Sequence, residues 1–252
     1  MKKRKDDISK YFKMVGTFEK ITKLLFWLNM FINVLLFVNL NFKFYISLIS
    51  LIITIVYIVL MNVNDMFLKN TAEKERRKSF LKESFNINLT PNQTNKYYNN
   101  KLNPSLEKMG LNCYESVFFS KRIANKMLVV SLFKIVFAIV IYVIMLVLVD
   151  SIDVILIATQ TLFSTEVLFY FIKLCYYNFH LKKLDEELYN LLFSMNNVTD
   201  EIKIIILERV FDYECLKNYS KISLSSAIFN KYNDEWSKEW RKILKNYPSN
   251  EN

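Results

Sequence analysis

Lys134 and Glu166 are charged residues that lie inside long apolar stretches of the sequence, at 127–149 and 154–173. Each stretch is about long enough, as a helix, to cross the ~30 Å hydrocarbon core of a membrane. With a rise of ~1.5 Å per residue, both side chains would lie roughly 20–22 Å from the short connection between the stretches. An ionisable side chain within a membrane is costly and needs a partner. The sequence therefore predicts that Lys134 pairs with Glu166, within one chain or across a subunit boundary.

Two interpretations of this pair stay open. In the first, the polar contact is purely structural. Lys134 lies only about two turns inside the membrane, so its long stem could carry the ammonium to the headgroups. Glu166 lies deeper and has Gln160 and several hydroxyl residues nearby. Because charges within membranes commonly mark transport pathways, the alternative is a water-lined path that includes these polar side chains.

The elements that position the pair follow from four apolar runs in a chain of 252 residues, 52% of them hydrophobic. They predict an all-α membrane protein with two transmembrane helical hairpins and a helical cytoplasmic region. Lysine and arginine concentrate outside the runs and away from their short connections, which predicts four spans with both termini cytoplasmic. The predicted parts are a basic cytoplasmic N-terminus (1–23), a first transmembrane hairpin (24–63), a cytoplasmic central segment (64–126), a second transmembrane hairpin (127–173) and a helical cytoplasmic C-terminal region (174–252).

Polar residues recur on one side of each of the first two spans. Asn29 and Asn33 are four residues apart, and the second span carries a similar stripe of hydroxyl groups at Ser47, Ser50, Thr54 and Tyr57. Such groups are poorly satisfied in lipid, so both stripes should face other helices. They are either ordinary contacts between membrane helices or the lining of a polar lumen formed by several subunits.

The cytoplasmic parts read as helices with one long loop. Residues 64–84 predict a helix whose surface carries Glu73 and Arg76, and the asparagine-rich stretch 86–103 predicts a loop. The aromatic segment 111–122 should pack against the C-terminal tail or the membrane surface. The tail should contain a helix with a leucine stripe at residues 181–195, a second helix capped by Thr199 or Asp200 and a last helix with two tryptophans; the inward residues of the second helix are expected to be Ile202, Ile205, Ile206 and Val210.

Motifs that would carry chemistry are missing from the sequence. There is no nucleophile elbow, no phosphate-binding glycine loop and no metal-binding pattern, His180 is the sole histidine, and the three cysteines are scattered. We therefore expect no enzyme, no catalytic residue, no cofactor and no metal site. The formal charge of +10 is assigned to membrane orientation and not to nucleic-acid binding.

Basic and aromatic residues of the cytoplasmic parts are the candidates for ligand binding. Arginine supplies forked donors for phosphate, and tyrosine supplies a face for stacking. The same residues would equally suit the anionic surface of the membrane, and both alternatives stay open. These candidates are Arg76, Arg77, Tyr97, Tyr98, Lys121 and Arg122.

The segment YYNNKLNPSLEKMGLNCYESVFFSKRIA, which precedes the third span, and the arrangement of two plus two spans are similar to a known family. They resemble the SMODS-associating four-transmembrane putative pore-forming effectors of bacterial antiphage operons. Beside the two tyrosines of the segment, the residues that carry the resemblance are Glu115, Ser116, Phe118, Phe119, Ser120 and Lys121.

The resemblance implies an oligomeric effector of the bacterial inner membrane that serves in antiviral defence by abortive infection. A nucleotide second messenger, a cyclic nucleotide from a partner nucleotidyltransferase, would trigger permeabilisation of the membrane. The alternative from another class is a non-enzymatic membrane anchor or scaffold that binds a partner protein through its helical tail. In both cases we expect the spans to contact membrane lipid.

Overall fold

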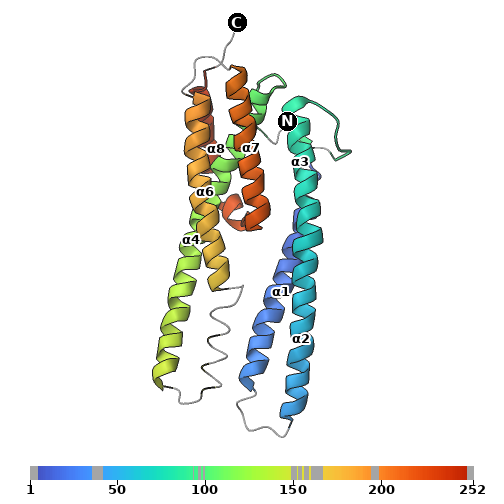
Figure 1. Ribbon diagram of the computed structural model, residues 1–252, viewed down its shortest axis with the longest axis vertical. Helices are drawn as coiled ribbons and strands as arrows, with labels where there is room; N and C mark the ends of the chain where they lie inside the picture. The colour runs from blue at the N-terminus through green and yellow to red at the C-terminus, as the bar shows by residue number, and fades with distance from the viewer. Residues whose placement is uncertain are drawn as a thin grey trace. The chain divides into compact units, whose positions relative to one another are not determined.

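The computed structural model describes residues 5–35, 42–92, 94–95, 98, 100–148, 152, 155, 159, 167–193 and 199–248 (Figure 1). These residues are helical except for loops and one short antiparallel pair, β1 (Lys5–Asp6) with β2 (Thr94–Asn95), in which Lys5 is opposite Asn95. The helices are α1 (Ser9–Leu35), α2 (Lys43–Val63), the π-helical η1 (Asn64–Leu68), α3 (Lys69–Phe85), α4 (Leu106–Leu148), α6 (Leu168–Phe193), α7 (Asp200–Ser220) and α8 (Ser226–Lys245). The expectation of a helical protein is confirmed.

The chain divides into two compact units. Unit 1 consists of Met1–Ser9, Glu73–Val129 and Lys173–Asn252, and unit 2 consists of Lys10–Ala72 and Val130–Ile172. Helices α3, α4 and α6 each contribute residues to both units.

Unit 2 contains most of the apolar helical surface. Two helices among the described residues are long and apolar enough to cross a membrane, the continuous Lys43–Phe85 (α2, η1 and α3) and Leu106–Ile144 within α4. Only 6% and 11% of their most apolar segments are buried, whereas the core helix of a soluble protein would be mostly buried. Four spans are not shown, since the predicted first and fourth spans include residues outside the described ones, 36–41 and most of 154–166.

Within unit 2, α1 and α2 lie side by side and are joined by side-chain hydrogen bonds (Figure 1). Asn29 Nδ2 donates to Thr54 Oγ1 at 2.9 Å, and Ser50 Oγ lies 2.8 Å from the amide oxygens of both Asn29 and Asn33. At one end of this pair, Lys69 forms ion pairs with Glu19 at 3.0 Å and with Asp65 at 2.9 Å. The prediction that the polar stripes face other helices is confirmed for Asn29, Asn33, Ser50 and Thr54; Ser47 is exposed.

The core of unit 1 forms where α4 meets the three C-terminal helices. Tyr114 and Phe118 of α4 both contact the ring of the fully buried Trp240 of α8, with ring centroids 5.3 Å apart in each pair. The prediction that segment 111–122 packs against the tail is therefore confirmed. The predicted leucine stripe of α6 is also inside, with four leucines buried at positions Leu181, Leu184, Leu188 and Leu191.

The boundaries of the last two helices follow from their caps. Thr199 accepts a hydrogen bond from the backbone N–H of Ile202 at the start of α7, and Ser225 caps α8 in the same way through Ile228. Helix α7 ends at Ser220 and is followed by Lys221, whose φ of 50° is left-handed. Ile206 and Val210 are buried as predicted and Ile202 is half-buried, but the expectation that Ile205 faces inward is wrong, because it is 41% exposed.

Gly110 gives a test of how tightly unit 1 is packed. A Cβ atom at this position of α4 would lie 2.7 Å from Cγ2 of Ile206 on α7 and 3.4 Å from Leu192 on α6. We expect Gly110→Ala to lower the free energy of unfolding by about 1–2 kcal/mol, since the overpacking exceeds the helical preference for alanine. Gly16→Ala is the matched control, because nothing lies within 4 Å of its added Cβ, and it should be neutral or stabilising. Thermal unfolding in detergent measures both; equal effects of the two changes would contradict the close packing.

Candidate functional site

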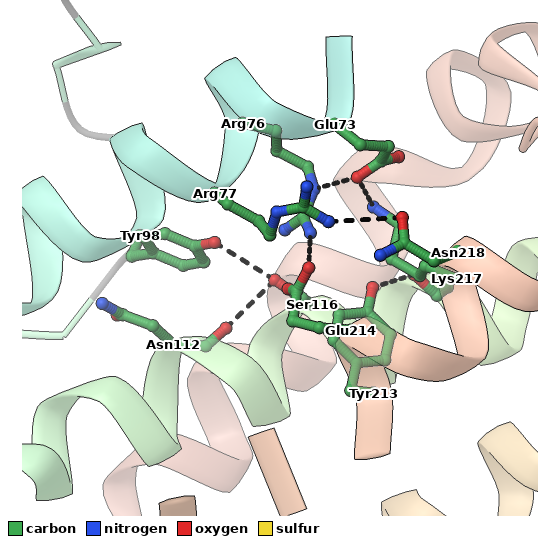
Figure 2. A network of polar contacts seen from close by, with 11 residues as sticks. Glu73, Arg76, Arg77, Tyr98, Asn112, Ser116, Tyr213, Glu214, Lys217 and Asn218 are labelled. Carbon is green, nitrogen blue, oxygen red and sulfur yellow. Dashed lines mark hydrogen bonds and ion pairs between the residues drawn. The ribbon is translucent and has the colours of Figure 1, made fainter. Parts of the chain in front are cut away.

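Four charged side chains of α3 and α7 form a buried ion-pair cluster in unit 1, consisting of Glu73, Arg76, Glu214 and Lys217 (Figure 2). Arg76 Nε donates to Glu73 at 2.6 Å, and the other end of its guanidinium pairs with Glu214. Lys217 Nζ lies 3.0 Å from the same Glu73 oxygen that Arg76 contacts. Each of the four side chains is only 13–17% exposed. The cluster thus joins α3 to α7 through charges that are largely removed from water.

The spacing of these residues along each helix explains how the cluster forms. Glu73 and Arg76 are three residues apart on α3, and Glu214 and Lys217 are three residues apart on α7, so each helix presents one acid and one base on one face. The two pairs then meet across the helix contact. Two acids and two bases leave the cluster without net charge, which is how buried ions are tolerated.

Further polar residues lie around the cluster (Figure 2). Arg77 donates to Asn218 Oδ1 at 3.2 Å, which adds a second contact between α3 and α7. Tyr213 and Ser120 share a buried hydrogen bond of 3.0 Å between α7 and α4. Tyr98 lies 3.2 Å from the hydroxyl of Ser116, and the Ser116 hydroxyl donates to the backbone oxygen of Asn112. The polar layer therefore continues from the ion pairs onto α4.

The electrostatics of the cluster favour its charged form. Burial by itself raises the pKa of the Glu73 carboxyl, but the positive charges of Lys217 and Arg76 beside it lower that pKa by more than burial raises it. The pKa of Glu73 is therefore about 2. Burial lowers the pKa of Arg76, yet the two carboxylates outweigh it and raise that pKa well above the ordinary value. Burial and the neighbouring Arg76 lower the pKa of Lys217, against the opposite effect of Glu73 and Glu214. Glu73 and Arg76 are therefore ionised at neutral pH.

The arrangement of the cluster suits an exchange of ion-pair partners better than the catalysis of a chemical reaction. No described acid of the cluster lacks a basic partner, and the adjacent Cys113 thiol is fully buried, with a pKa that burial raises. A thiol in such surroundings is a poor nucleophile. An anionic group that reached Arg76 or Lys217 would have to replace Glu73 or Glu214, and would thereby weaken the contact between α3 and α7.

The chain matches no known protein family, no curated protein and no solved structure.

The predicted ligand-binding residues that the structure describes lie in unit 1 and are engaged within the fold. Lys121 pairs with Asp185 of α6, and Arg122 pairs with Glu239 of α8 while its guanidinium lies 3.6 Å from the Phe118 ring centroid. Tyr98 contacts Ser116 and the ring of Phe80. Arg76 and Arg77 belong to the α3–α7 contact, and Tyr97 is outside the described residues. Their role in binding a ligand stays a prediction.

The predicted intramembrane residues fall into two groups. Asn29 and Asn33 are brought together with Ser50, as given above. Lys134 is exposed on α4 and forms no ion pair with any described residue, while Gln160 and Glu166 lie outside the described part of the chain. The pairing of Lys134 with Glu166 therefore stays a prediction.

The residues that carry the family resemblance lie on one stretch of α4. Glu115, Phe118 and Ser120 are buried, Ser116 joins the polar layer beside the cluster, and Phe119 contacts Phe229 of α8 with ring centroids 5.9 Å apart. Their surroundings place them in the packing of unit 1 rather than on an open surface.

Sequence reasoning missed Glu214 and Lys217 altogether and assigned Glu73 and Arg76 to a solvated helix surface, which is wrong for both. The partners are far apart in sequence, 138 residues between Arg76 and Glu214 and 144 between Glu73 and Lys217. The available signal was the repeated spacing of acid and base three residues apart on two predicted helices. That spacing is common on exposed helices, so it does not identify which helices meet.

Proposed function

We propose that the chain is an oligomeric effector of the bacterial inner membrane that permeabilises this membrane when its cytoplasmic helical part receives a signal. The observation that supports this most is the continuous helix Lys43–Phe85. Its first part, α2, is an apolar segment of span length, and its last part carries Glu73 and Arg76 of the ion-pair cluster. A change at the cluster therefore acts on a helix that also enters the membrane.

The proposed signal is a cyclic nucleotide from a partner nucleotidyltransferase, in antiphage defence. Its phosphates would compete with Glu73 and Glu214 for Arg76, which prefers planar, bidentate anions. Arg77 and Tyr98 lie close to the same site and would add a donor and an aromatic face (Figure 2). Because the cluster is neutral, binding of the anion would free a carboxylate and weaken the contact between α3 and α7.

The membrane part is proposed to have four spans with both termini cytoplasmic. Four helices of one chain cannot easily enclose water, so several copies must assemble. A polar surface within the apolar segments is supported by the hydrogen-bonded group of Asn29, Asn33, Ser50 and Thr54. These amide and hydroxyl groups could exchange their hydrogen bonds to one another for hydrogen bonds to water. Lys134 and Glu166 would lie on the same path or stabilise its walls.

The second candidate function is a membrane anchor that binds a partner protein through its helical tail. One observation favours it: α7 exposes large apolar side chains, with Ile204 68%, Phe211 59% and Tyr219 75% exposed. These residues share one face of the helix, and such faces often mark protein contacts.

The membrane potential of cells distinguishes the two functions. Cells that produce the chain together with a nucleotidyltransferase that makes a cyclic nucleotide should lose their membrane potential within minutes, whereas cells with the chain alone should keep it. A retained potential, with a protein co-purifying through residues 176–252 and lost in a Phe211→Ser variant, would contradict the effector and support the anchor.

A further inference from the structure

Lys126 and Lys231 are two lysines of unit 1 that lie beside one aromatic ring. The ammonium of Lys126 on α4 is 5.0 Å from the centroid of the Tyr232 ring, and that of Lys231 on α8 is 5.3 Å from the same centroid. Tyr232 stacks in turn on Trp236, with centroids 5.2 Å apart and planes 16° from parallel. Two positive charges thus lie beside one aromatic ring, which a second ring supports by stacking.

These two lysines differ from the neighbouring basic residues of α4. Lys121 and Arg122 each pair with a carboxylate, whereas Lys126 and Lys231 are exposed and form no ion pair with any described residue. Asp234 and Glu235 lie one turn further along α8 and are not within ion-pair distance of Lys231. The pair of ammonium groups is therefore available to an anion from outside the chain.

The position of the pair in the sequence indicates which anion this is. Lys126 is directly followed by Met127, where the apolar part of α4 begins. The backbone N–H of Ser225 donates to the sulfur of Met127 at 3.4 Å, which holds the start of α8 at the same level of α4. A lysine at the end of an apolar helix, with a tyrosine beside it, is typical of the membrane–water interface.

We propose that Lys126, Lys231 and Tyr232 bind the phosphate of an anionic phospholipid at the cytoplasmic surface of the membrane. The lysines neutralise the phosphate, and the tyrosine ring holds both side chains beside it. Bound lipid would fix the start of α8 beside α4. The proposal rests on the membrane location given above but not on permeabilisation, so its test uses lipid binding alone.

The experiment measures the thermal unfolding of the full chain in neutral detergent after addition of phosphatidylglycerol or phosphatidylcholine. Phosphatidylglycerol should raise the unfolding temperature of the wild type by about 2–4 °C, and phosphatidylcholine should not. Lys126→Gln with Lys231→Gln should abolish the increase. Lys238→Gln with Lys242→Gln is the matched control, because both lysines are exposed on α8 and neither forms an ion pair within the part of the chain that the structure describes; it should retain the increase.

Three results would overturn the proposal: an undiminished increase in the Lys126/Lys231 variant, an equal loss in the control, or an equal increase with inorganic phosphate alone, since that would assign the site to a soluble anion. If the double variant does not fold, Lys231→Gln alone and the charge-preserving pair Lys126→Arg with Lys231→Arg replace it. The increase should then be reduced in the first and kept in the second, and the opposite pattern would equally overturn the proposal.

Discussion

Replacing Arg76 by methionine should lower the free energy of unfolding of unit 1 by about 3–5 kcal/mol. The change removes the one base that contacts both Glu73 and Glu214, so two carboxylates stay buried with Lys217 alone to neutralise them. Methionine keeps much of the volume of the arginine stem, which limits the loss of packing. Denaturant unfolding, followed by circular dichroism of the protein in detergent, measures the effect.

Arg77→Met is the control for this prediction, because Arg77 is the next residue of the same helix. Among the described residues, its side chain is joined to Asn218 by an exposed hydrogen bond, so its replacement should change the free energy of unfolding by less than about 0.5 kcal/mol. The double variant Arg76→Met with Glu214→Gln should be more stable than Arg76→Met alone, since it removes one of the unpaired charges. Similar losses for Arg76→Met and Arg77→Met would show that the cluster contributes nothing particular to the fold.

Acid should weaken unit 1 through Glu73. The pKa of this carboxyl is about 2 in the folded protein, below the ordinary value of 4.5 in an unfolded chain. The unfolded state therefore binds the proton more readily, so the stabilisation is fully present above pH 4.5 and is lost as the pH falls towards about 2. The free energy involved is on the order of 3 kcal/mol.

The comparison of wild type with Glu73→Gln isolates this contribution from that of other carboxylates. The free energy of unfolding of both proteins, measured between pH 7 and pH 2.5, should differ most at neutral pH and converge as the pH falls below 4.5. A difference that stays constant over this range would mean that Glu73 is not the group whose ionisation stabilises the folded state.

Local features of this chain could be predicted from its sequence because they depend on near neighbours. The apolar run at 44–63 predicts α2, and Thr199 predicts the start of α7 through the hydrogen bond that its hydroxyl accepts. The polar stripes at Asn29 and Thr54 follow from the cost of unsatisfied groups in lipid and are joined in the structure. In each case the physical cause lies within one helix or one hairpin.

The contacts between distant helices could not be predicted in this way. Three successive isoleucines, Ile204 to Ile206, cannot all face inward on one helix, and the pattern does not say which one does; only Ile206 is fully buried. The charged run at 73–78 has the composition of a solvated surface, yet Arg76 is covered by α7. Burial of such residues depends on which helix packs against them, and one sequence alone carries little information about that.

The most direct test of the central claim is the membrane potential of cells that produce Glu214→Gln without any nucleotide-producing partner. Glutamine keeps the shape of the side chain but removes the charge that holds Arg76 to α7. If release of the ion-pair cluster opens the membrane, these cells should depolarise, while cells producing the wild type or the merely destabilised Gly110→Ala should not. A normal potential in Glu214→Gln cells, at membrane levels equal to those of the wild type, would contradict the claim. Equal depolarisation by Gly110→Ala would contradict it as well, because general instability of unit 1 would then be sufficient.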